Sequence, residues 1–261
     1  MTPLPTFATL AVDVSFVGAG PGGATHLTLG AYRALQEADV VIHDRLVGAE
    51  ILALIPATTR RIDMGKAGFG PSTAQSDINT TLVAEAMTGA RVVRLKGGDC
   101  GIFGRLDEEI EALEAAGLSF RIVPGLTSAS VAAATIGQSL TRRGRNAALR
   151  IVTGHDMDGF AEQDWRAMAR AGEVTAIYMG KKSARFIQGR LMMHGADAAT
   201  PVTLVENVSR ADQRVLAATL ATLPEAAARL EGPAVILYGL APRQKSRGAT
   251  HALTQSHEVR A

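Results

Sequence analysis

The residues best suited to chemistry stand in a glycine-rich stretch, LKGGDCGIFGR, at positions 95–105. Its two adjacent glycines, Gly97 and Gly98, would let backbone amides and carbonyls approach a ligand without obstruction by side chains. Behind them, the carboxylate of Asp99 could hold an amine or a hydroxyl group. The stretch follows the apolar run ARVVRL, so these groups are expected where a strand ends. The pattern predicts a small-molecule site.

A second glycine-rich motif, VGAGPGG at positions 17–23, could instead belong to a dinucleotide-binding protein. Gly18, Gly20 and Gly23 satisfy GxGxxG after a strand, and an acidic residue follows at the distance that such a fold requires. Against this interpretation, Pro21 removes an amide from the loop that should bind pyrophosphate. The following THLTLG also delays the helix whose N-terminus should face the phosphates. An NAD-dependent oxidoreductase is therefore the weaker alternative.

Four motifs taken in order resemble those of the tetrapyrrole methylases: VGAGPGG, HDRLV at 43–47, LKGGDCGIFGR, and PGLTSAS at 124–130. The resemblance covers roughly residues 12–241, and this colinearity is more specific than any single pattern. It implies two α/β domains, with mostly parallel or mixed sheets and a cleft between them. It also implies transfer of the methyl group of S-adenosyl-L-methionine to carbons of a cyclic tetrapyrrole. The motifs are most similar to those of members that methylate uroporphyrinogen III twice to precorrin-2, releasing S-adenosyl-L-homocysteine.

The resemblance implies three candidate catalytic residues. Asp44 in HDRLV and Lys66 in MGK match positions to which the family assigns a proton acceptor and a proton donor, and Arg105 lies in FGR. Displacement at a sulfonium methyl group requires an in-line pyrrole carbon close to van der Waals contact, and exclusion of water helps it. The electron-rich pyrrole needs no metal, only the removal of a proton. Positioning is therefore the main task of the site.

Ligand-binding candidates follow from the same resemblance. Uroporphyrinogen carries eight carboxylates, which guanidinium groups can bind through paired contacts. We expect the tetrapyrrole to be bound by Arg45, Glu108 and Arg143, the last in LTRRG, where relatives usually have LTHRD. We expect the cosubstrate to be bound, largely through backbone groups, by Pro21, Gly97, Gly98, Asp99, Ile102, Thr127, Ser128, Met179, Val208 and Ala234.

The chain departs from the family pattern in two segments near the expected tetrapyrrole site. Where relatives commonly show GKRxGxH, this chain reads GKAGFGP at 65–71. Where relatives show GGDPFIFGR, Cys100 and Gly101 replace the proline and the phenylalanine. A methylase of a later precorrin, and a catalytically silent tetrapyrrole-binding protein, are therefore alternatives to the double methylase.

Two series of elements must position these residues. Strand-like and helix-like runs alternate over residues 12–123, with a polar loop after residue 44, and again over residues 124–242. This alternation predicts two α/β domains, the first on the tetrapyrrole side and the second bordering the cosubstrate cleft. Residues 243–261 are polar without apolar periodicity and are expected to form a mobile tail.

Composition narrows the class of protein further. The chain has 261 residues, 47% of them apolar, and a formal net charge of +2, which gives little support to nucleic-acid binding. Its single cysteine excludes an internal disulfide and a cysteine-rich zinc site, and no histidine pair at ligand spacing supports a metal. No leader pattern and no apolar run of about 20 residues is present. We expect a metal-free cytoplasmic enzyme, not bound to membranes, and, from the resemblance, a homodimer serving sirohaem, cobalamin or haem d1 synthesis.

Overall fold

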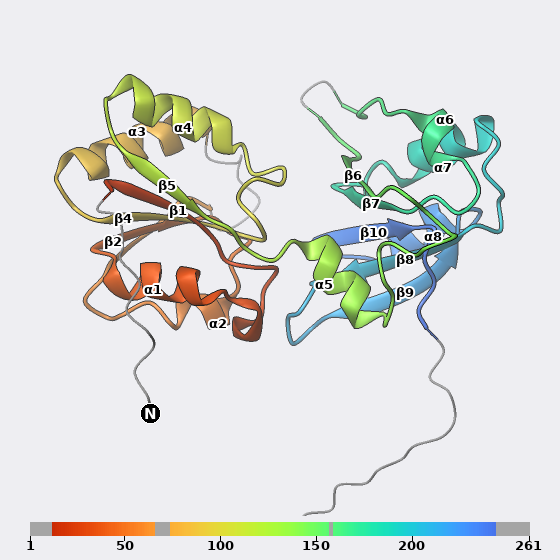
Figure 1. Cartoon of the computed structure of the whole chain (residues 1–261), viewed down its shortest axis with the longest axis horizontal. Helices are drawn as coiled ribbons and strands as arrows, with labels where there is room; N and C mark the ends of the chain where they lie inside the picture. The colour runs from red at the N-terminus through yellow and green to blue at the C-terminus, as the bar shows by residue number, and fades with distance from the viewer. Residues whose placement is uncertain (1–11, 66–73, 157–158, 244–261) are drawn as a thin grey trace, which may run out of the picture.

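The structure is a computed structural model that describes residues 12–65, 74–156 and 159–243. Figure 1 shows two α/β lobes, each built on one sheet and joined by the chain that runs from β5 to α5. The expected fold class, two α/β units with parallel and mixed sheets, is confirmed. The expected tail lies outside the described residues, apart from its first position.

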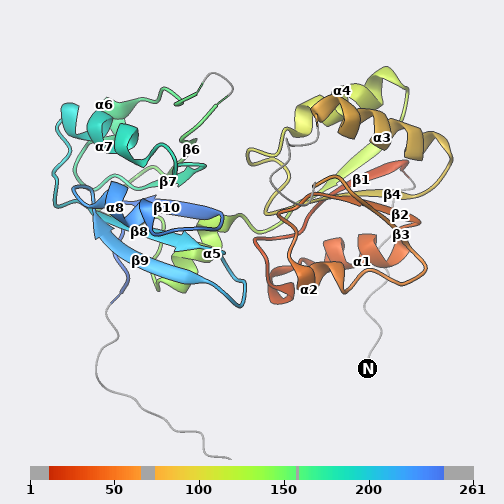
Figure 2. The ribbon, with the colours of Figure 1, turned by 180° about the vertical axis from the view of Figure 1, so that it is seen from behind.

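The first lobe is a parallel sheet of five strands covered on both faces. Its order is β3 (Arg60–Asp63), β2 (Val40–His43), β4 (Val92–Lys96), β1 (Val14–Gly18) and β5 (Phe120–Val123). Helices α1 (Leu29–Glu37) and α2 (Ala49–Leu52) cover one face, and α3 (Gln75–Met87) and α4 (Leu106–Ala115) cover the other (Figures 1 and 2). The central strands are therefore buried on both faces, which explains the mostly apolar sequences of β1 and β2, whereas β4 also buries Arg94 and Lys96.

The second lobe is a mixed sheet of five strands. Its order is β6 (Arg150–Thr153), β7 (Thr175–Tyr178), β10 (Ala234–Tyr238), β8 (Pro201–Glu206) and β9 (Arg214–Thr219), in which only β6 and β7 run parallel. One core packs α6 (Trp165–Met168), α7 (Ala184–Met193) and α8 (Leu223–Ala228) against one face of the sheet. A second core packs α5 (Ser128–Thr135) against the opposite face.

The expected polar loop after residue 44 instead contains α2 and β3, and β9 was not predicted. The sequence of β3, RRID, is charged, and its side chains are mostly exposed because it is an edge strand. The other edge strand, β9, is also largely exposed. Edge strands with polar or exposed faces give a weak periodic signal, since only one side of the backbone pairs within the sheet.

The parallel strands place three loops at one edge of the first sheet. The chain leaves β1, β2 and β4 at their carboxyl ends, which lie side by side in a parallel sheet. Gly20 and Gly98 join two of these loops, with N···O distances of 3.0 and 2.7 Å between their backbones. A methyl group on Gly18 would lie 2.5 Å from the backbone nitrogen of Gly125, so the chain leading into the second lobe packs backbone against backbone. Glycine is required at these close approaches.

Candidate active site

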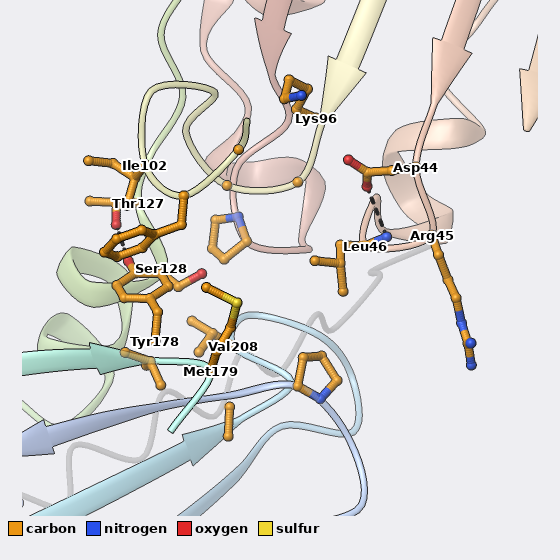
Figure 3. Close-up of a pocket in the computed structure, with 18 of the residues that line it drawn as sticks. Asp44, Arg45, Leu46, Lys96, Ile102, Thr127, Ser128, Tyr178, Met179 and Val208 are labelled. Carbon is orange, nitrogen blue, oxygen red and sulfur yellow. Dashed lines mark hydrogen bonds between the residues drawn. The ribbon is translucent and has the colours of Figure 1, made fainter. Parts of the chain in front are cut away.

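A cavity of about 900 Å³ opens where these loops meet the second lobe. Its wall is contributed by the ends of β1, β2 and β4, by the start of α5, and by the segments after β7 and β8. All ten positions predicted for the cosubstrate line it, as do Asp44, Arg45 and Arg105. Figure 3 shows labelled residues of both lobes around this space. The cavity is thus shared between the two sheets.

Asp99 fixes the shape of the glycine loop. Its Oδ1 accepts a hydrogen bond from the backbone nitrogen of Gly101 at 2.9 Å, and its Oδ2 accepts one from Gly125, also at 2.9 Å. The carboxylate therefore ties the loop after β4 to the segment that enters the second lobe. A carboxylate oxygen has room for a second hydrogen bond, so Asp99 can still accept from a ligand.

Asp44 lies at the end of β2, beside the end of β4, in a turn that its own side chain stabilises. Its Oδ1 accepts a hydrogen bond from the backbone nitrogen of Leu46 at 3.0 Å. In Figure 3 the side chain of Arg45 extends away from Asp44 and Leu46. Arg45 is exposed, so it borders the cavity at its rim.

Arg105 is held at the cavity by Glu108. Its Nε and one terminal nitrogen each lie 2.6 Å from a carboxylate oxygen of Glu108, a bidentate pair at the start of α4. These hydrogen bonds hold the pKa of Glu108 below its usual range. Glu108 itself does not line the cavity. Arg143 is exposed beyond α5 and does not line it either, and Lys66 lies outside the described residues.

The second lobe contributes a wall of polar and apolar residues around a partly buried phenol. The Tyr178 hydroxyl pairs with Thr127 Oγ1 and accepts a hydrogen bond from the backbone nitrogen of Ala129 at 2.9 Å. Burial raises the pKa of Tyr178, so the phenol remains neutral near pH 7. The Phe103 ring lies 5.4 Å from the Tyr178 ring, centroid to centroid. Next to Tyr178, Met179 has a left-handed backbone with φ of 53° and a half-exposed side chain.

Sequence reasoning missed several residues of the cavity wall. These include apolar or aromatic groups, such as Leu46 and Phe103, and a buried charged group, Arg94, Lys96 and Glu109. The aromatic residues carry no signal of their own, because apolar side chains next to a strand end are ordinarily core. The charged group did carry one: two cations alternate with apolar residues in VVRLK, which is unusual for a strand buried on both faces.

Two features of the structure bear on the alternatives. The backbone nitrogen of Gly23 donates to Ser209 Oγ at 2.9 Å, so this loop amide binds the second lobe, and the loop is followed by a 3₁₀ turn before α1 begins at Leu29. Both observations count against a dinucleotide site. Across the described ranges, no group of three or more His, Cys, Asp or Glu could hold a metal ion, and no helix could span a membrane.

Two α/β lobes that share a cavity at the carboxyl ends of parallel strands place the chain in the class of two-lobed α/β proteins. The family model for tetrapyrrole (corrin/porphyrin) methylases matches residues 13–224, and the chain belongs to this family.

Curated relatives include siroheme synthase 3 of Aeromonas hydrophila, 45% identical over 227 residues, and the siroheme synthase of Edwardsiella ictaluri, 46% identical over 228 residues. Both matches cover 87% of this chain but only 48% and 49% of the relatives, so the chain spans about half their length.

Solved structures of the same architecture include uroporphyrin III C-methyltransferase from Thermus thermophilus, with a TM-score of 0.74 and 35% identity over 87% of this chain and 91% of that one. That enzyme is also known in complex with S-adenosyl homocysteine. A cobalt precorrin-4 methyltransferase matches with a TM-score of 0.77 at 23% identity, over 87% of this chain and 94% of that one, which shows the shared fold alone.

Proposed function

We propose that this chain is an S-adenosyl-L-methionine-dependent methyltransferase of cyclic tetrapyrroles, and that it methylates uroporphyrinogen III twice to precorrin-2, releasing S-adenosyl-L-homocysteine. The observation that carries the proposal is the shared cavity, which brings Asp44 together with the glycine loop after β4 and the start of α5. Family membership and similarity to the Thermus thermophilus enzyme support the reaction class and the substrate.

The glycine loop fits the cosubstrate because it offers backbone groups and a carboxylate without an intervening side chain. Gly98 has φ of +74°, and a methyl group on it would meet no heavy atom of the described residues within 4 Å. Its backbone therefore borders open space in the cavity. Asp99 is placed to accept hydrogen bonds from the methionine ammonium group. When bound, the cosubstrate supplies a methyl group on a sulfonium centre, activated for displacement.

Asp44 is the proposed proton acceptor. One of its oxygens is engaged by the backbone of Leu46, which leaves the other for a proton released from the methylated ring carbon. Apolar side chains from both lobes, Leu46, Ile102, Phe103, Met179 and Val208, surround the space and favour exclusion of water. Lys66 remains the predicted proton donor.

Cations of the first lobe are proposed to bind the tetrapyrrole carboxylates. Arg105 lines the cavity with its guanidinium oriented by Glu108, and Arg45 stands at the rim. Arg143 remains a prediction, since it is exposed outside the cavity wall. A homodimer is likewise a proposal, to be measured by light scattering of the purified protein.

The test is anaerobic incubation of the purified protein with S-adenosyl-L-methionine and uroporphyrinogen III, followed by mass spectrometry and absorbance of the tetrapyrrole. We expect the product to gain two methyl groups. Binding of S-adenosyl-L-homocysteine without methylation would contradict the substrate and favour a later precorrin or a silent binding protein. Tight binding of NAD, with none of S-adenosyl-L-homocysteine, would contradict the reaction class.

A further inference from the structure

Three charged side chains are buried together at the tetrapyrrole side of the cavity. Arg94 and Lys96 project from β4, and Glu109 projects from α4 above it; they are 2%, 4% and 0% exposed. Glu109 Oε1 accepts from Lys96 Nζ at 2.7 Å, and both Glu109 oxygens accept from Arg94 Nε at 3.2 to 3.3 Å. Burial of charge is costly, so such a cluster needs a structural or functional reason.

The cluster holds two cations and one carboxylate, a formal excess of one positive charge. Arg94 Nη2 also donates to Glu109 Oε1 at 3.2 Å, and its Nη1 donates to the backbone carbonyls of Ile42 and Leu95. Lys96 has three N–H donors, and among the described residues Glu109 provides its one hydrogen-bond acceptor. Among the described residues, two of the three Lys96 donors therefore have no hydrogen-bond partner.

The N–H donors of Lys96 lie at the wall of the cavity and not in the hydrophobic core of the first lobe. Arg94, Lys96 and Glu109 all belong to its wall, together with Gln75. His43 on β2 is paired in register with Leu95 on β4, so the next positions along the two strands are Asp44 and Lys96. Figure 3 shows these two residues at the ends of the neighbouring strands. Burial and the Arg94 charge lower the pKa of Lys96, while Glu109 and Asp44 oppose that change.

We propose that Lys96 forms a carboxylate-binding subsite, in which its ammonium group donates to one carboxylate side chain of the tetrapyrrole beside Asp44. The inference rests on the proposed function for the class of ligand, a polycarboxylated macrocycle. Glu109 holds the ammonium through its hydrogen bond, and Arg94 in turn holds the Glu109 carboxylate. A carboxylate bound here would accept from the free donors of Lys96 and would fix one pyrrole ring next to the proposed proton acceptor.

The experiment measures equilibrium binding of uroporphyrin, the stable oxidised octacarboxylate, by quenching of its fluorescence, so that turnover is not required. Lys96→Met and Lys96→Gln remove the charge with little change in volume, and Arg94 still neutralises Glu109 in both. Loss of one charge-assisted hydrogen bond predicts affinity about 10- to 100-fold weaker in both variants. The matched control is Arg170→Met, which removes an exposed cation outside the cavity wall.

Binding of S-adenosyl-L-homocysteine distinguishes the outcomes. The inference predicts that it is unchanged in all three variants, while uroporphyrin binding weakens in the two Lys96 variants alone. Wild-type uroporphyrin affinity in those variants would overturn the subsite and leave the proposed function standing. Loss of binding of both ligands in the Lys96 variants would assign Lys96 a purely structural role and would also overturn the subsite. A wild-type protein that binds S-adenosyl-L-homocysteine but not uroporphyrin would overturn the proposed substrate and the subsite together.

Discussion

Replacing Gly98 by alanine tests whether its backbone borders the cosubstrate. The variant strains the left-handed backbone and also adds a methyl group at the cavity. Gly98 has φ of +74°, a region that costs a residue with a Cβ about 1–2 kcal/mol. Apart from Gly98 and its two chain neighbours, no described residue has a heavy atom within 4 Å of the added methyl group, so no clash adds to this cost. Since Gly98 lines the cavity, the methyl group enters the space assigned to the cosubstrate.

Gly117 provides a matched control. It follows α4, has φ of +70°, has equally open space around an added methyl group, and does not line the cavity. Gly98→Ala and Gly117→Ala should therefore lose similar stability in denaturant unfolding. For binding, overpacking of about 1–3 kcal/mol predicts affinity for S-adenosyl-L-homocysteine about 5- to 150-fold weaker in Gly98→Ala alone.

Isothermal titration calorimetry of both variants would measure this difference. Equal, wild-type affinity in Gly98→Ala and Gly117→Ala would refute the assignment of the Gly98 backbone to the cosubstrate wall. An equal loss of affinity in both variants would show that backbone strain transmitted through the fold, and not contact with the ligand, controls binding. Only a selective loss in Gly98→Ala agrees with the proposed site.

Three further predictions concern the chemistry of the cavity and its support. Asp44→Asn keeps the acceptor for the Leu46 backbone, so it should retain the fold and S-adenosyl-L-homocysteine binding while turnover falls about 10²- to 10⁴-fold in the anaerobic methylation assay; unchanged turnover would remove Asp44 as proton acceptor. Arg105→Met should reduce turnover on uroporphyrinogen III with cosubstrate binding intact, and wild-type kinetics would exclude Arg105 from the site. Burial raises the pKa of Cys100 to about 11, so at pH 8 a thiol reagent should label Cys100 only after unfolding; rapid labelling of the native protein would contradict its burial.

The glycine loops of the cavity wall were the part that the sequence predicted most directly. Gly97 is fixed by its close approach to Leu46 and Gly98 by its positive φ, and both needs are visible as a glycine motif after an apolar strand. Hydrogen bonds between residues that are distant in the sequence gave no such motif. The hydrogen bond from Gly125 to Asp99 and the pairing of Lys96 with Glu109 depend on how strands and helices pack, and sequence spacing does not encode that.

The structure also explains why the altered GGDCG segment is compatible with the site. Cys100 is fully buried, with its Sγ 3.7 Å from the carbonyl oxygen of Val123, and Gly101 is exposed. Neither residue belongs to the cavity wall, whereas Asp99 before them and Ile102 after them do. The Gly101 backbone nitrogen still donates to Asp99, so the loop keeps the hydrogen bond that orients its carboxylate. The two replacements therefore change the support of the loop, while the groups proposed to meet the cosubstrate keep their places.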